Sequence, residues 1–131
     1  MRTLLAVAMI CAAPIAVRAD DPSLATDRAA PEVALTATEG WRLDAIVRMD
    51  VEGDTLVLVI EGDVINYSDR ERTSPTIRFG LRDKEGREFY HWTMRLAEPR
   101  IRPRDWVAFD TRLERPPEDA HTVEIRTVDS D

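Results

Sequence analysis

The sequence predicts an all-β protein that folds as one antiparallel β-sandwich. Three observations indicate this class. Apolar and polar residues alternate with a period of two over most of the chain after Gly40, turn residues separate the alternating segments, and no segment after Gly40 has the period of a helix. The length of 131 residues fits a single domain. A small β-barrel is the alternative that the same pattern allows.

Six segments carry the alternation. We expect strands at residues 41–50, 56–66, 76–82, 89–96, 107–113 and 123–127. Asp83-Lys84-Glu85-Gly86 predicts a tight hairpin in which Gly86 is left-handed. Alternation directs Trp92 toward the core and Trp106 toward solvent. In the second strand the expected core face consists of Leu56, Leu58, Ile60 and Val64.

Residues 1–19 have the pattern of a secretory signal peptide. Arg2 precedes an apolar run from Leu4 to Val17, and Ala19 is a small residue before the expected cleavage point. The run is short for a membrane span, which needs about 20 apolar residues, and Pro14 interrupts it. We therefore expect a periplasmic or secreted protein, cleaved after Ala19, with no transmembrane segment in the mature chain. An uncleaved membrane anchor is the alternative.

Residues 20–40 are expected to form a flexible linker with one short element at Val33–Ala37, and residues 41–131 the β-sandwich domain. Cleavage would remove Cys11, the single cysteine, which excludes thiol catalysis, disulfides and cysteine-ligated metals. Cleavage would also leave 16 basic against 25 acidic residues, a net charge of −9 in place of −7. An acidic chain argues against nucleic acid as the partner.

No pattern for catalysis or for a cofactor emerges from the residues. His91 and His121 are the only histidines, and no serine stands in a strand-to-helix elbow where one of them could activate it. The carboxylates of Asp50, Glu52 and Asp54 lack the spacing of a calcium loop and fit a solvated turn better. We therefore expect no enzyme activity, no metal and no cofactor.

Two groups of residues are candidates for an interaction surface. Trp106, Phe89 and His91 are expected to face outward, and an exposed patch of Trp106 and Phe89 would mark a contact surface. Arg100, Arg102 and Arg104 lie close together in an otherwise acidic chain and could hold an acidic partner. Asn66-Tyr67-Ser68 matches a glycosylation acceptor, but this pattern is too frequent to support an assignment.

A family resemblance rests on turn and core positions spread between Trp41 and Val128. They are Gly62–Asp69, Pro75, Leu81–Asp83, Gly86, Trp92, Ile101–Pro103, Phe109, Leu113, Pro116, Pro117, Ala120 and Val123–Ile125. In this order they resemble a bacterial family of domains of unknown function, usually found C-terminal to a zinc ribbon and one membrane span. The cysteine pairs of the ribbon and the span are absent here, and Arg104 stands where the family usually has glycine.

The resemblance implies an immunoglobulin-like or fibronectin-III-like β-sandwich of six to seven strands, working as an extracytoplasmic and non-enzymatic interaction module in a Gram-negative envelope. The expected function is therefore an exported interaction or scaffolding domain whose partner is an envelope protein, bound for example at an exposed sheet edge. The alternative is a carbohydrate- or cell-wall-binding module that uses Trp106, Phe89 and Tyr67 as an aromatic platform.

Overall fold

The computed structural model describes residues 28–129, and every helix or strand in this range is a β-strand. The all-β class is therefore confirmed. The signal peptide expected at residues 1–19 lies outside the described residues. The strands are β1 (Glu32–Thr36), β2 (Trp41–Glu52), β3 (Thr55–Asn66), β4 (Arg72–Thr73), β5 (Thr76–Arg82), β6 (Glu88–Arg95), β7 (Arg100–Ile101), β8 (Trp106–Glu114) and β9 (Thr122–Val128).

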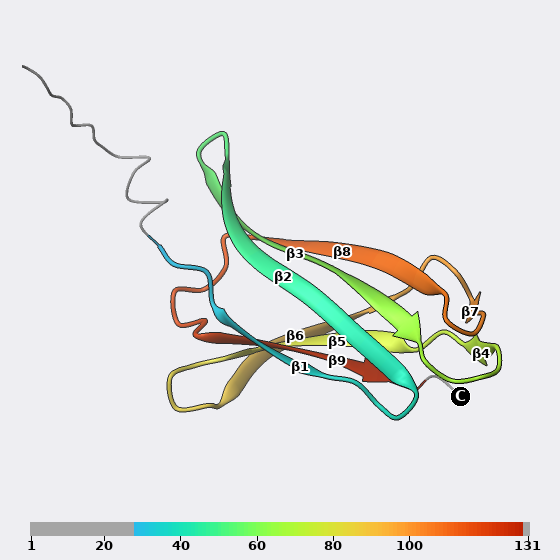
Figure 1. Ribbon diagram of the computed structural model, residues 1–131. Helices are drawn as coiled ribbons and strands as arrows, with labels where there is room; N and C mark the ends of the chain where they lie inside the picture. The colour runs from blue at the N-terminus through green and yellow to red at the C-terminus, as the bar shows by residue number, and fades with distance from the viewer. Residues whose placement is uncertain (1–27, 130–131) are drawn as a thin grey trace, which may run out of the picture.

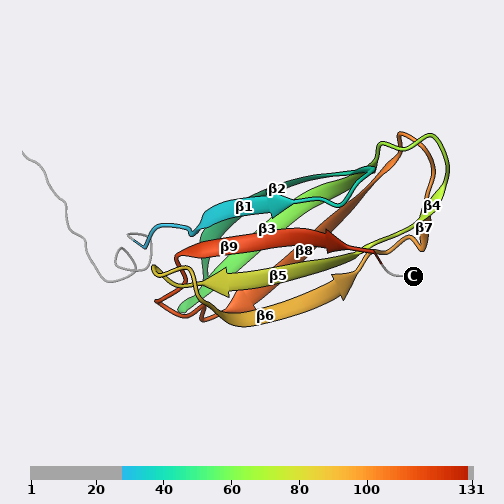
Figure 2. The same ribbon diagram turned by 90° about the horizontal axis from the view of Figure 1, so that it is seen from below.

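The strands form two main sheets that lie one above the other (Figure 1). One sheet has the strand order β2-β3-β8 and the other has the order β1-β9-β5-β6, while β4 and β7 pair separately at one end of the molecule (Figure 2). All neighbouring strands are antiparallel except β1, which runs parallel to β9. Within residues 28–129 no helix is long and apolar enough to cross a membrane.

The six strands expected from alternation correspond to β2, β3, β5, β6, β8 and β9. Gly86 has φ 83° in the β5–β6 turn, as the hairpin pattern predicted. The expected domain start at Trp41 needs correction. The short element in the linker is β1, in which Val33 and Leu35 lie opposite Val123 and Ile125 of β9. The four-stranded sheet therefore begins at Glu32.

An aromatic cluster joins the two sheets through the core. The ring of Phe79 on β5 stacks on Trp92 of β6 at 5.1 Å and contacts Phe109 of β8 at 6.0 Å between ring centroids. The indole Nε1 of Trp92 donates to Thr111 Oγ1 of β8 at 3.2 Å. Trp92 thus faces the core, as predicted, and links β6 of one sheet to β8 of the other.

Residues 57–60 of β3 are buried on both faces of the strand, which alternation did not predict. Leu58, Ile60 and Val64 face the core as expected, while Leu56 is only half-buried. Val57 and Val59 point to the opposite face, yet they are 1% and 2% exposed. Val59 lies between Arg48 of β2 and Arg112 of β8 in the strand register, and the apolar stems of such arginines cover a neighbouring side chain.

Candidate interaction surface

The outer face of the three-stranded sheet carries the most exposed aromatic residue of the described chain, Trp106, which is 58% exposed. Trp106 opens β8 and lies directly opposite Ile65 of the central strand β3. Ile65 in turn lies opposite Arg42 of β2. Because residues directly opposite each other project to the same face, these three side chains form one row across the sheet.

Tyr67 extends this row beyond the end of β3 and is 46% exposed. Arg42 Nη1 donates to the Tyr67 hydroxyl at 2.7 Å, and the guanidinium groups of Arg42 and Arg104 each lie 5.8 Å from the Tyr67 ring centroid. The hydrogen bond to Tyr67 and the charge of Asp44 raise the pKa of Arg42. We call Trp106, Ile65, Tyr67, Arg42 and Arg104 the tryptophan surface.

Arg104 adopts a backbone conformation that normally requires glycine. Its φ is 67°, and the amide of Asp105 donates to the carbonyl of Arg102 at 3.1 Å across a turn with Pro103 and Arg104 at its centre. A turn with proline first and a left-handed residue second is type II, which favours glycine at the second position. The turn therefore keeps the geometry that a glycine would give it. Arg104 also donates through Nη1 to the Tyr67 carbonyl at 2.9 Å.

Asn66 holds the chain that positions Tyr67. This fully buried side chain donates through Nδ2 to the carbonyls of Arg70 and Ile101 at 2.9 and 2.8 Å. Its Oδ1 accepts from the backbone amide and the hydroxyl of Ser68 at 2.9 and 2.7 Å. Because Nδ2 is buried and bonded, Asn66 is not available as a glycosylation acceptor in the folded protein.

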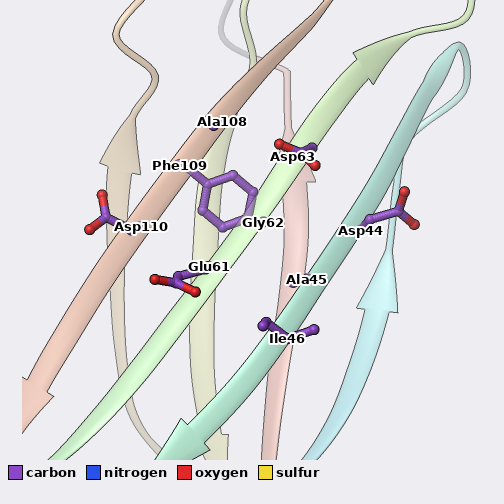
Figure 3. Close-up of a pocket in the computed structure, with 9 residues that line it drawn as sticks. All are labelled: Asp44, Ala45, Ile46, Glu61, Gly62, Asp63, Ala108, Phe109 and Asp110. Atoms are coloured by element: carbon purple, nitrogen blue, oxygen red, sulfur yellow. The ribbon is translucent and has the colours of Figure 1, made fainter.

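An acidic depression of about 530 Å³ adjoins the tryptophan surface on the same sheet face (Figure 3). Four carboxylates surround it, those of Asp44, Glu61, Asp63 and Asp110, and Ala45, Gly62 and Ala108 also line it. Glu61 pairs with Arg48 at 2.7 Å and Asp44 with Arg42 at 3.5 Å. Within residues 28–129, Asp63 and Asp110 have no ion-pair partner, so their charge is uncompensated.

Gly62 leaves room for the buried ring of Phe109 on the core side of the depression. A Cβ at this position would lie 2.6 Å from the Phe109 ring and also collide with the backbone carbonyl of Asp44. Across the described part of the chain, no group of three or more His, Cys, Asp or Glu side chains has the arrangement of a metal site.

Three of the residues predicted for the surface lie together. Arg100, Arg102 and Trp106 line a second depression of about 490 Å³ at the end of the molecule that carries β4 and β7. Arg100 pairs with Glu71 at 2.7 Å, and Arg102 with Asp105 at 3.4 Å. These ion pairs neutralise much of the positive charge that the sequence suggested for the segment, since exposed acidic partners are already in place.

Phe89 and His91 do not belong to this surface, and the expected patch of Trp106 with Phe89 is wrong. Both residues lie on β6, in the other sheet, and the β5–β6 turn, from which β6 starts, lies at the opposite end of the molecule from the start of β8 (Figure 2). Phe89 also occupies a bulge, because Leu81 pairs with Tyr90 but Arg82 pairs with Glu88. His91 is exposed opposite Gly80. Alternation tells which face a residue takes, but not which sheet its strand joins.

Glu88, beside Phe89, forms a bidentate ion pair with Arg78 at 2.8 and 2.6 Å. The hydrogen bond from Arg78 lowers the pKa of Glu88 below its ordinary value near 4.5. A lowered pKa in the folded state stabilises the protein above the pKa of the unfolded chain, and this contribution is lost as the pH falls below about 4.5 and through the folded pKa.

We therefore expect Glu88→Gln to lower the free energy of unfolding by about 1 kcal/mol at pH 7 and to have little effect near pH 3. Urea denaturation at both pH values measures this. Glu85→Gln is the control, because Glu85 is exposed and its contact with Arg87 is long, at 3.8 Å. An equal effect of Glu88→Gln at the two pH values would show that the ion pair does not carry the stability.

The sequence did not indicate Arg42, Ile65 or the acidic depression as parts of one surface. These residues occupy the outward positions of three strands, and the signal that joins them is the register, which pairs Asp44 with Asp63 and Glu61 with Asp110. A pattern of outward-facing residues along one strand does not contain that information.

Comparison with known proteins gave no match to a family model, to a curated protein or to a solved structure. The resemblance to the bacterial domain family therefore stays a prediction.

Proposed function

We propose that this chain is an exported, non-catalytic interaction domain of the bacterial cell envelope that binds a protein partner on the outer face of β2-β3-β8. We also propose that the two sheets form an immunoglobulin-like sandwich. A three-stranded sheet opposite a four-stranded one supports it, because this is the division found in constant-type immunoglobulin domains. The observation that carries the function is the exposed Trp106 beside an acidic depression on one face.

The residue types on this face are those that contribute most to protein interfaces. Tryptophan, tyrosine and arginine are enriched among residues whose truncation weakens binding by 2 kcal/mol or more, on the order of a 30-fold loss of affinity. Trp106, Tyr67 and Arg104 supply all three within the tryptophan surface. The uncompensated charges of Asp63 and Asp110 fit a basic side chain of the partner and would steer its approach.

The test is capture of the partner from envelope extracts by chemical cross-linking, with the protein first recovered from the periplasm of a Gram-negative host. We expect a periplasmic chain that begins at Asp20 and that captures a specific protein. Trp106→Ala should reduce this capture about tenfold or more. Phe89→Ala is the matched control, since Phe89 is also an exposed aromatic residue, at 42%, but lies on the other sheet.

A second variant tests the electrostatic part of the proposal. Asp63→Asn combined with Asp110→Asn should weaken capture at low salt and make it less dependent on salt concentration, because the partner's basic group loses its counter-charges. Equal capture by the parent and by Trp106→Ala would argue against the proposal. So would binding of peptidoglycan fragments that quenches Trp106 fluorescence when no protein is captured, since that result favours the carbohydrate-binding alternative.

A further inference from the structure

Strand β6 is an edge strand whose central part lacks the charges by which natural edge strands avoid pairing with another chain. It borders the four-stranded sheet (Figure 2), and its other side has no strand partner within residues 28–129. From Phe89 to Met94 it has six consecutive uncharged residues. Edge strands of soluble proteins usually carry charges that prevent pairing with another chain. The two edge strands of the other sheet, β2 and β8, carry such charges, at Arg42, Asp44, Arg48, Asp50, Glu52, Asp110, Arg112 and Glu114.

The side chains of β6 are also incompletely covered. Tyr90 is 45% exposed, although it lies opposite the buried Leu81 on the core-facing side of its sheet. Its ring contacts Trp92 at 5.5 Å between centroids, and Trp92 and Met94 are half-buried. The core-facing side chains of β6 are therefore partly exposed at the edge of the sheet, and an added strand would cover Tyr90, Trp92 and Met94.

We propose that β6 pairs with β6 of a second copy of this chain, antiparallel, about a two-fold axis at Trp92. Residues directly opposite each other in an antiparallel pair project to the same face. In this register Tyr90 lies opposite Met94 of the second copy, and His91 lies opposite Thr93. Both pairs match in character, the first apolar on the core side and the second polar on the outer side.

Charge complementarity at the ends of the strand supports this register. A bulge makes two residues of one strand oppose one residue of its partner. Arg95 of the second copy therefore meets the bulge formed by Glu88 and Phe89, on the outer side where Glu88 projects. Arg95 has no ion-pair partner within residues 28–129. In the dimer each of the two Arg95 side chains gains the carboxylate of Glu88 as a partner, which it shares with Arg78 of that copy. A two-fold pairing uses up both β6 edges, and assembly stops at the dimer.

The first test is the mass of the full chain in solution by sedimentation equilibrium. A small edge-to-edge interface predicts a weak dimer, with a mass that rises with concentration from one copy toward two. Tyr90→Lys should shift the protein to a monomer, because pairing would bury an unpaired charge against Met94 of the other copy. Ile46→Lys is the control, since Ile46 is an exposed apolar residue, at 61%, on the edge strand β2.

The second test fixes the register without disturbing the apolar side. In a Cys11→Ser background, a mixture of His91→Cys and Thr93→Cys proteins should form a disulfide between the two chains, because directly opposite Cβ atoms lie about 5 Å apart. Neither variant alone should cross-link with itself. A monomer at all concentrations, a dimer that survives Tyr90→Lys, assembly beyond two copies, or cross-linking of one cysteine variant with itself would each overturn the proposal.

Discussion

Phe79→Ala is expected to lower the free energy of unfolding by about 4 kcal/mol. Phe79 is fully buried, and its ring contacts Trp92 in its own sheet and Phe109 in the facing sheet. Alanine would remove both contacts and leave a cavity between the sheets, which the paired strands on either side cannot fill. Chemical denaturation followed by tryptophan fluorescence measures the loss, because Trp92 stacks directly on the deleted ring.

Phe89→Ala is the control for this variant. Phe89 is 42% exposed in the β6 bulge, so its truncation should change stability by no more than about 0.5 kcal/mol. A loss of less than about 1 kcal/mol for Phe79→Ala would mean that the two sheets are not held together through the aromatic cluster.

Asn66→Ala is expected to lower the free energy of unfolding by about 3 kcal/mol. The change removes the partners of two backbone carbonyls, those of Arg70 and Ile101, and of the amide of Ser68. A buried polar group left without a partner destabilises the folded state by about 1–3 kcal/mol, and water can compensate in part at the exposed end of the loop. Hydrogen exchange should show the loss of protection around Ser68 and Ile101.

Two further variants separate the roles of the Asn66 side chain. Ser68→Ala removes only the hydroxyl contacts of the loop and should lower stability by about 1 kcal/mol. Asn66→Asp keeps the acceptor but loses both Nδ2 donations, so it should resemble Asn66→Ala in stability. An Asn66→Asp protein as stable as the parent would show that the two carbonyl contacts do not hold the loop.

The local sequence pattern was sufficient to predict the strands that are long and have one apolar face. Trp92 and Trp106 were assigned to opposite faces because each belongs to a strand of at least eight residues with clear alternation. β4 and β7 contain two residues each and therefore have no detectable period. The burial of Val59 on the outer face depends on its position between Arg48 of β2 and Arg112 of β8, which a single strand does not reveal.

The candidate surface divides in the same way. Arg100, Arg102 and Arg104 are close in the sequence and were expected to lie together, whereas Trp106 was expected to lie with Phe89. Tyr67 and Arg42 join Trp106 and Arg104 through the pairing of β2, β3 and β8. Phe89 is excluded because β6 belongs to the other sheet. These are long-range pairings, which alternation along one strand does not specify.

The most direct measurement of the central claim is the amount of partner that cross-links to Trp106→Ala relative to Phe89→Ala in the same envelope extract. Both variants remove one exposed aromatic side chain from a folded protein, but only Trp106 lies beside the acidic depression. We predict that this ratio is at most about one tenth. A ratio close to one would contradict the assignment of the partner to the outer face of β2-β3-β8.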